Sequence, residues 1–339
     1  MNQYARTERS PLGGDYTAAL DWFDRQLAAH GLTLAAPVEL AKERDWATVF
    51  RAETSGGVLW LKLSGAGTRF EVGLYDLMHR IAPEHVLEPL ALDVDRAWIV
   101  LPDGGPLLAD QTDAERLPGQ LEQVFAQYAE LQLAVAGHTD ELLRIGVTDM
   151  RAEIMPERFD EALAFVVPYL GRRGTEPERA AYEHVSSMHG QIAEWCARLA
   201  AAPGLASIDH NDLHPWNVFY VEGPGGVQST FYDWGDAVLA HPFASMLIGL
   251  GAPKRLHGWA DDDPRMLRMR DAYLEPFAAW GSRAELVETL ELSCRVGQIA
   301  RALVWARAVG EAGASAPDTY QTAPMEYLAN LLHPSHLGA

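Results

Sequence analysis

The pattern of apolar and polar positions divides the chain into a strand-rich first third and a helix-rich remainder. In residues 15–31, Leu20, Phe23 and Leu27 recur with the period of an amphipathic helix. Short runs rich in β-branched and aromatic residues follow, bounded by turn residues. The first third is therefore expected to form a small, mostly antiparallel sheet with one helix. We predict strands over residues 34–40, 47–52, 58–63, 86–93 and 96–101, and the helix over residues 68–80.

From about residue 115 the apolar spacing becomes helical, as at Leu121, Val124 and Tyr128. A Pro/Gly-rich turn at residues 102–106 separates this part from the sheet and predicts a hinge. We therefore predict an α+β fold with two lobes, residues 1–101 and 107–339, on either side of that hinge. Within the second lobe we predict helices over residues 157–170, 176–199 and 284–308, and a hairpin of strands over residues 218–221 and 229–232.

Composition narrows the possible partners. The formal net charge of −20 repels nucleic acid and anionic membranes, so neither is expected as a partner. Such a charge serves either solubility or the attraction of a cationic small molecule, and the sequence gives the two explanations about even weight. The two cysteines are too few for a disulfide framework, and no apolar run is long enough for a transmembrane helix. Residues Met1–Arg6 show no apolar leader, so a cytoplasmic location is expected.

Two neighbouring motifs carry the candidate chemistry. Residues 208–219 contain His210, Asp212 and Asn217 in the pattern H-x-D-x-x-x-x-N, and residues 231–236 contain Asp233 in the sequence Asp-Trp-Gly. The predicted hairpin between them brings Asn217 and Asp233 together. A carboxylate beside a hydroxyl nucleophile, with oxygen ligands for Mg²⁺ on nucleotide phosphates, is what phosphoryl transfer requires. Each residue alone has an ordinary turn or strand-end explanation, whereas the joint pattern favours a phosphotransferase.

Lys62 is a charged residue within an apolar strand, in a chain with three lysines and 24 arginines. An ammonium on a flexible stem suits a strand residue that reaches phosphate oxygens. A solvent-facing edge strand is the simpler explanation, but the position of Lys62 before the helix and upstream of the motifs favours nucleotide binding. Glu71, early in the predicted helix, is the expected ion-pair partner, with Asp76 as a competitor.

These motifs resemble the catalytic loop and metal-binding turn of protein kinases. The sequence is most similar to the aminoglycoside phosphotransferase and choline kinase family, in which the loop reads H-G-D-x-x-x-x-N; Asn211 stands where the family has glycine. The resemblance implies a bilobal kinase-like fold that binds ATP and Mg²⁺. It also implies that Asp212 is the catalytic base and that Asn217 and Asp233 hold the metal. His210 is expected to brace the loop by hydrogen bonding.

The remaining nucleotide contacts are less specific. Neither a G-x-G-x-x-G nor a P-loop pattern occurs in the sequence, which excludes Rossmann and P-loop nucleotide sites. Backbone groups of residues 46–48 are expected near the phosphates, with Thr48 as a side-chain donor. The resemblance places Leu101 and Asp103 at the hinge, where backbone groups would meet the adenine.

The acceptor is expected to be a small molecule, with an aminoglycoside, amino sugar or amino alcohol as the leading class. A neutral sugar, an amino acid such as homoserine, and a non-catalytic nucleotide-binding protein are the alternatives. Asp236 has two possible roles, a helix cap or a metal or substrate carboxylate, and the cap is favoured. Candidate recognition residues are the acidic Asp149, Glu153, Asp236, Glu275, Glu288 and Glu291 and the aromatic Trp259, Tyr273, Trp280 and Trp305, although solvated or core positions are their commoner explanation.

Overall fold

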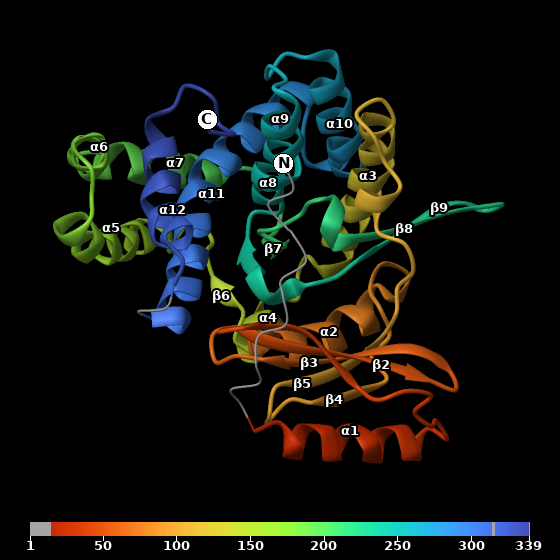
Figure 1. The fold of residues 1–339 in the computed structure, drawn as a ribbon. Helices are drawn as coiled ribbons and strands as arrows, with labels where there is room; N and C mark the ends of the chain where they lie inside the picture. The colour runs from red at the N-terminus through yellow and green to blue at the C-terminus, as the bar shows by residue number, and fades with distance from the viewer. Residues whose placement is uncertain (1–14, 314–315, 339) are drawn as a thin grey trace.

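The protein folds into two lobes, as Figure 1 shows. The computed structural model describes residues 15–313 and 316–338; residues Met1–Arg6, for which no apolar leader was predicted, lie outside them. The first lobe is a five-stranded antiparallel sheet with strand order β1-β2-β3-β5-β4 and two helices. Its elements are α1 (Thr17–Ala29), β1 (Glu39–Arg44), β2 (Ala47–Thr54), β3 (Gly57–Ser64), α2 (Phe70–Ile81), β4 (Ala91–Asp93) and β5 (Trp98–Pro102).

The predicted helices and the central strands of this lobe are confirmed, but two edge strands differ. β1 begins at Glu39, and Leu34 forms only an isolated bridge with Thr54. The strand predicted over residues 86–93 is reduced to β4, because Pro89 has no N–H for the ladder and a 3₁₀ turn ends just before it, at His85. The two edge strands therefore do not coincide with the apolar runs from which they were predicted.

The two faces of the sheet have different partners. α1 covers the outer face, where Phe23 packs with Phe50, Leu61 and Val100. α2 lies on the inner face, between the sheet and the second lobe (Figure 1), and joins the main core that both lobes share. Because successive residues of a strand point to opposite faces, Lys62 in β3 points toward α2 while Leu61 points toward α1. This alternation aims Lys62 at the space between the lobes.

The second lobe is mainly helical. Its two motifs lie beside two small β elements, the mixed three-stranded sheet β6-β10-β7 and the hairpin β8-β9. The elements in chain order are α3 (Leu117–Val135), α4 (Thr139–Ile145), β6 (Thr148–Asp149), α5 (Met155–Arg172), α6 (Glu176–Ser186), α7 (His189–Ala201), β7 (Ser207–Asp209), β8 (Val218–Gly223), β9 (Gly226–Phe231), β10 (Val238–Ala240), α8 (Met246–Gly249), α9 (Gly251–His257), α10 (Pro264–Leu274), α11 (Arg283–Ala312) and α12 (Asp318–Ala329).

One long helix, α11, packs against several other helices of this lobe. α11, the longest helix at 30 residues, begins with a capping box at Ser282 and runs against α5, α7 and α12. Its C-terminal half is buried almost all round, with Ile299, Ala300 and Leu303 in the core. Among the described residues, no helix is long and apolar enough to span a bilayer. α11 reaches the loop of residues 208–219 through Arg301, which pairs with Asp212.

Candidate active site

Lys62 joins the two lobes through a pair of carboxylates. Its Nζ donates to Glu71 Oε1 at 2.7 Å and to Asp233 Oδ1 at 2.6 Å. Glu71 is fully buried, and Ser64 Oγ lies 3.3 Å from its second oxygen. Asp76, the competing candidate, does not take this position. The three charged side chains come from β3, α2 and the turn after β9, so the sheet, its helix and the hairpin converge at one point.

Electrostatics keep this cluster charged. Burial by itself lowers the pKa of the Lys62 ammonium, but Asp233 and Glu71 outweigh that effect and raise the pKa above its ordinary value. Burial raises the pKa of Glu71, and Lys62 only partly offsets the rise. For Asp233, whose side chain is 40% exposed, burial is outweighed by Lys62 and Lys42, which lower its pKa to about 2. At neutral pH the Lys62 ammonium and the Asp233 carboxylate are therefore both ionised.

The catalytic loop depends on one residue in a left-handed conformation. Asn211 has φ 60°, a value that glycine adopts freely and asparagine tolerates better than most side chains. The buried carboxylate of Asp209 accepts hydrogen bonds from the backbone N–H of Asn211 at 2.8 Å and from its Nδ2 at 3.1 Å. This Asx-type contact stabilises the left-handed conformation of Asn211.

A buried polar network fixes the loop from beneath. Ser245 Oγ donates to Asp209 Oδ1 at 2.7 Å, and the hydroxyl of Tyr128 accepts from the backbone N–H of His210 at 3.0 Å. Gln132 donates to the carbonyl of Ile208 at 2.7 Å. Burial raises the pKa of Asp209, against the effect of its hydrogen bonds. These contacts come from α3 and from the turn before α8, so they depend on the tertiary fold.

His210 braces the turn that carries Asp233. Its Nε2 lies 3.0 Å from the carbonyl oxygen of Tyr232 and its ring packs on Trp234, with centroids 4.6 Å apart. Burial lowers the pKa of His210, so the imidazole is neutral and its Nε2–H donates to the carbonyl. The backbone N–H of Asp233, at φ 62°, donates to the hydroxyl of Tyr75. Through its contacts with Tyr232 and Trp234, His210 has the bracing role that was expected for it.

Asp212 lies among hydrogen-bond donors at the end of the loop. Its Oδ1 accepts from Arg301 Nη2 at 2.7 Å, and its Oδ2 is 3.2 Å from His214 Nε2 and 3.3 Å from Asn217 Nδ2. Burial raises the pKa of the Asp212 carboxyl, but Arg301 and His214 outweigh burial and hold the pKa well below its ordinary value. Asp212 is therefore an ionised carboxylate that is oriented on both oxygens.

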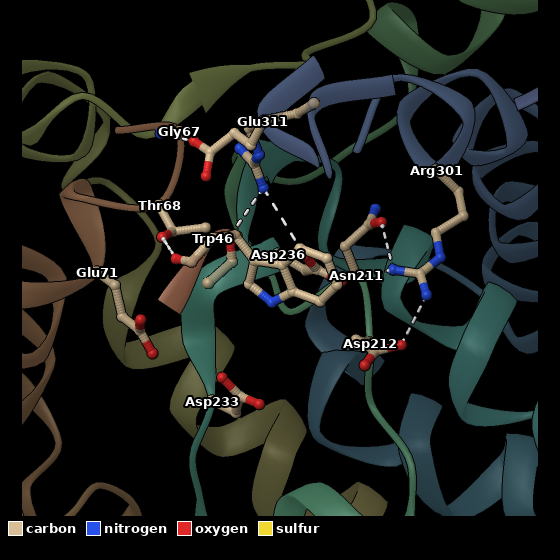
Figure 2. Close-up of polar contacts among 12 residues, drawn as sticks. Trp46, Gly67, Thr68, Glu71, Asn211, Asp212, Asp233, Asp236, Arg301 and Glu311 are labelled. Atoms are coloured by element: carbon tan, nitrogen blue, oxygen red, sulfur yellow. Dashed lines mark hydrogen bonds and ion pairs between the residues drawn. The ribbon is translucent and has the colours of Figure 1, made fainter. Parts of the chain in front are cut away.

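Asp236 does not cap a helix, and the favoured role predicted for it is wrong. It is the last residue of a 3₁₀ turn, Trp234–Asp236, and its side chain accepts from Arg301 Nη1 at 2.9 Å. Burial raises its pKa more than Arg301 lowers it. Arg307 holds the same turn by donating to the carbonyl of Gly235 at 2.8 Å. The carboxylate of Asp236 thus faces the same space as Asp212, as Figure 2 shows.

These side chains line a cavity of about 900 Å³ between the lobes. Lys62, Asp212 and Asp233 line it together with residues of the β1–β2 turn, α11 and α12. In three of its lining residues, Arg301, Trp305 and Glu311, a buried polar atom has no hydrogen-bond partner in the described part of the chain. The other polar and aromatic residues that line the cavity are Lys42, Arg44, Trp46, Thr68, Asp236, Arg307, Thr319, Tyr320, Glu326 and Tyr327.

Three of the predicted nucleotide contacts lie apart from this cavity. The Thr48 hydroxyl is 3.3 Å from the hydroxyl of Tyr16 and points toward the α1 side of the sheet, away from Lys62. Leu101 is buried in β5 opposite Trp60. The N–H of Asp103 already donates to the carbonyl of Val58 at 3.1 Å, and its carboxylate accepts from Trp60 Nε1. The structure therefore leaves Thr48 without a route to a phosphate in the cavity.

Asn217 and Asp233 offer oxygen ligands that suit a Mg²⁺ ion bound to a nucleotide. Asn217 uses its Nδ2 to donate to the carbonyl of Asp212 at 3.0 Å, which leaves its Oδ1 as a hard oxygen ligand. Val218 pairs with Phe231, so Asn217 and Asp233 lie next to the paired ends of β8 and β9. Within the described residues, no cluster of three or more His, Cys, Asp or Glu side chains makes a metal site by itself. Mg²⁺ favours a ligand set in which two protein oxygens are completed by phosphate oxygens.

Comparison with known proteins shows the family and the fold. The model of the phosphotransferase enzyme family matches residues 38–286, whereas no curated protein matches the sequence. The choline kinase of Cryptosporidium parvum is 10% identical with a TM-score of 0.64 over 94% of both chains. The choline kinase LicA of Streptococcus pneumoniae is 12% identical with a TM-score of 0.60, over 92% of this chain and 99% of that one. The macrolide 2′-phosphotransferase MphH of Brachybacterium faecium is 16% identical with a TM-score of 0.54, over 91% and 98%.

The sequence did not predict most of the residues that line the part of the cavity beyond Asp212. Of the recognition candidates, only Asp236 and Trp305 line it; Tyr273 belongs to the buried network below the loop, and Glu288 pairs with Arg198 at the surface. Arg301 had a detectable signal, because it is a lone charge in the apolar run Val296–Val304. Glu311, Tyr320 and Tyr327 had none, since their positions depend on how α11 and α12 fold back over the first lobe.

Proposed function

This chain belongs to the phosphotransferase enzyme family, and we propose that it moves the γ-phosphate of ATP, with Mg²⁺, to a hydroxyl of a small molecule. The observation that carries the proposal is the convergence of Lys62, Asp212 and Asp233 on one cavity from three separate segments, with Asn217 hydrogen-bonded to Asp212 in the same loop. A phosphotransferase needs a phosphate anchor, a base and oxygen ligands in that relation.

Lys62, Asn217 and Asp233 would hold the nucleotide. Lys62 carries its positive charge on a flexible stem, and Glu71 pairs with its ammonium from the buried side, so the ammonium is held where it can meet phosphate oxygens. Asn217 Oδ1 and the Asp233 carboxylate would hold Mg²⁺. When bound, the ion offsets negative charge on the phosphates and orients the γ-phosphoryl group.

Asp212 would act on the hydroxyl group of the acceptor. The acceptor oxygen forms a bond to the γ-phosphorus as the bond to the bridging oxygen of ADP breaks and ADP leaves with that electron pair, while the hydroxyl proton passes to Asp212. Because the pKa of Asp212 is well below its ordinary value, the carboxylate is a weak base toward a neutral hydroxyl. Its first task is to orient the hydroxyl, and it takes the proton late, as bonding to phosphorus makes the proton acidic.

For the acceptor, we propose an amine-bearing molecule such as an aminoglycoside, an amino sugar or an amino alcohol. Support comes from the net charge of −20 and from the residues around the cavity beyond Asp212. There Glu311 and Glu326 accompany the rings of Trp305, Tyr320 and Tyr327, which is a combination that suits a cation. A neutral sugar or an amino acid is the alternative, supported by Arg301, whose charge offsets Asp212 and Asp236 at the inner end.

A non-catalytic nucleotide-binding protein is the rival of a different class. Such a protein needs no base, so the oriented and ionised state of Asp212 would have no purpose in it. The rival is distinguished by replacing Asp212 with Asn. A catalyst loses turnover and retains Mg·ATP binding, whereas a binding protein shows no turnover before or after the replacement.

The test is transfer of label from γ-labelled ATP, with Mg²⁺, to a panel of aminoglycosides, amino sugars, choline-like amines and neutral sugars. Asp233→Ala is run beside the wild type, and Asp262→Ala, an exposed aspartate in the turn before α10, is the matched control. We expect one compound to acquire label with the wild type and the control but not with Asp233→Ala. Label on no compound, together with no binding of Mg·ATP, would overturn the proposal.

A further inference from the structure

Arg301 lies between two carboxylates of the active-site cavity. Its Nη2 donates to Asp212 Oδ1 at 2.7 Å and its Nη1 donates to Asp236 Oδ2 at 2.9 Å. Nη1 also lies 3.4 Å from the side-chain oxygen of Asn211, the left-handed residue just before the base. Figure 2 shows the guanidinium reaching the catalytic loop from the opposite side of the cavity to Asp233. A planar fork with two donor nitrogens can connect two carboxylates in this way.

The position of this charge is closely constrained. Only 6% of the Arg301 side chain is exposed, and rings of Trp305 and Tyr327 lie 5.3 Å and 5.9 Å from its guanidinium carbon. A buried cation is costly unless carboxylates compensate it. In the described part of the chain, both carboxylates that pair with Arg301 line the cavity, so its charge is compensated within the site.

A purely structural tie between α11 and the loop is the simpler explanation. Arg295, six residues earlier on the same helix, has such a role, because it donates to the carbonyls of His333 and Pro334. Arg307 donates to the carbonyl of Gly235 and lies 3.9 Å from Asp236 Oδ1. Arg301 pairs with Asp236 more closely and also binds Asp212, the proposed base. The contact with Asp212 therefore separates Arg301 from Arg295 and Arg307.

We propose that Arg301 is a positioning residue, which holds the catalytic carboxylate of Asp212 and the carboxylate of Asp236 in a fixed relation around the acceptor hydroxyl. This role rests on the proposed function. Tying Asp212 Oδ1 to the guanidinium restricts the rotation of the carboxylate, so the hydroxyl meets a base of one orientation. Asp236, held by the other nitrogen, forms the second wall of the acceptor site and contributes to the choice of acceptor.

The role predicts a specific kinetic pattern. Arg301→Gln removes both ion pairs and should lower kcat about 10- to 100-fold, the usual cost of losing a group that orients a catalytic residue. The KM for Mg·ATP should not change, because Lys62, Asn217 and Asp233 are untouched. Arg301→Lys keeps the charge but reaches one carboxylate, so its kcat should lie between those of the wild type and Arg301→Gln. Asp236→Asn should raise the KM for the acceptor more than it lowers kcat.

The decisive experiment is a double-mutant cycle with Asp212→Asn. If Arg301 acts through Asp212, then Arg301→Gln costs little further activity once the base is gone, and the two effects are not multiplicative. Arg295→Gln is the matched control, expected to leave kcat unchanged in both backgrounds. Thermal unfolding and Mg·ATP binding confirm that each variant is folded, and Arg301→Lys serves where Arg301→Gln does not fold.

Each outcome of the cycle bears on the proposal. A 10- to 100-fold loss that disappears in the Asp212→Asn background supports it. Equal kcat for Arg301→Gln and the wild type, or losses that multiply with that of Asp212→Asn, overturn the role of Arg301 while leaving the proposed function intact. A folded wild type that transfers phosphate to no acceptor overturns the proposed function and this role together.

Discussion

The two ends of the cavity are built in different ways. The nucleotide end has a three-member cluster of Lys62, Glu71 and Asp233, in which one ammonium connects the two lobes. The acceptor end has Asp212, Asp236 and Arg301, in which one guanidinium connects the catalytic loop to α11. Both clusters therefore place a single cation between two carboxylates.

The difference lies in what each cation does. A lysine keeps rotational freedom and is suited to follow phosphate oxygens, whereas an arginine fixes two groups in one plane. In the proposed function, the nucleotide end therefore acts as an adaptable anchor and the acceptor end as a rigid frame for the base. Variants that act on one end and leave the other unchanged are the way to test this distinction.

The largest expected effect is on the base. Asp212→Asn should lower kcat by about 10²- to 10⁴-fold, as expected for the loss of a positioned general base. Mg·ATP affinity should be nearly unchanged, because the nucleotide end is intact. Steady-state kinetics and isothermal titration with Mg·ATP separate the two quantities. Activity equal to that of the wild type would contradict the assignment of Asp212.

Glu71→Ala should break the nucleotide end. It removes a fully buried partner of Lys62, and breaking such a pair costs about 3–5 kcal/mol of unfolding free energy. The KM for Mg·ATP should rise at the same time, with little change in the KM for the acceptor. Chemical denaturation and kinetics measure both effects. Asp76→Ala, a change of a neighbouring acid on α2, is the control, and an equal effect from it would refute the pairing.

Gly104→Ala tests the hinge. A Cβ at this position would overlap the ring of Phe219, which stacks on Tyr232 at 4.5 Å. Overpacking of this kind costs about 1–3 kcal/mol of stability and should raise the KM for Mg·ATP, because the turn next to the nucleotide end must move. Gly119→Ala, with open space around its Cα, is the control. A Gly104→Ala protein as stable as the wild type would show that the hinge yields freely.

Tyr320→Ala tests the acceptor end. Its ring lies 5.1 Å from that of Trp305 and 5.8 Å from that of Trp46, across the mouth of the cavity. For an amine-bearing acceptor we expect the acceptor KM to rise by the equivalent of about 0.5–2 kcal/mol, the range of a cation–π contact, with the KM for Mg·ATP unchanged. Phe165→Ala, an exposed ring on α5, is the control. An increase confined to the KM for Mg·ATP would reverse the assignment of the two ends.

The smallest expected effect is on acid stability. Because the folded-state pKa of Asp233 is lowered to about 2, this group stabilises the fold above its unfolded-state pKa of about 4 and loses that contribution as the pH falls toward 2. Unfolding free energies measured between pH 5 and pH 2 should fall more steeply in the wild type than in Asp233→Asn. Solvent screening of the 40% exposed side chain keeps the difference small. Parallel curves would show that the ion pair with Lys62 contributes nothing to stability.

Local sequence was enough to identify the candidate residues that stand in short motifs, namely Lys62, Asp212, Asn217 and Asp233, but not the further nucleotide contacts. The hairpin between Asn217 and Asp233 follows from its turn residues. The sheet of the first lobe was predicted for the same reason, since alternation along a strand depends on neighbours in the chain. The main error there, the strand at residues 86–93, concerned an edge, where Pro89 interrupts the pairing.

The tertiary structure decided the acceptor end. Arg301 is 89 residues from Asp212, and the network under the loop joins Tyr128, Gln132 and Ser245 across more than 70 residues of chain. Asp236 reads as a cap in its own sequence context and becomes a partner of Arg301 only when α11 folds over it. Periodicity and motif spacing describe contacts between near neighbours, whereas these contacts arise from the packing of helices whose order in space no local pattern encodes.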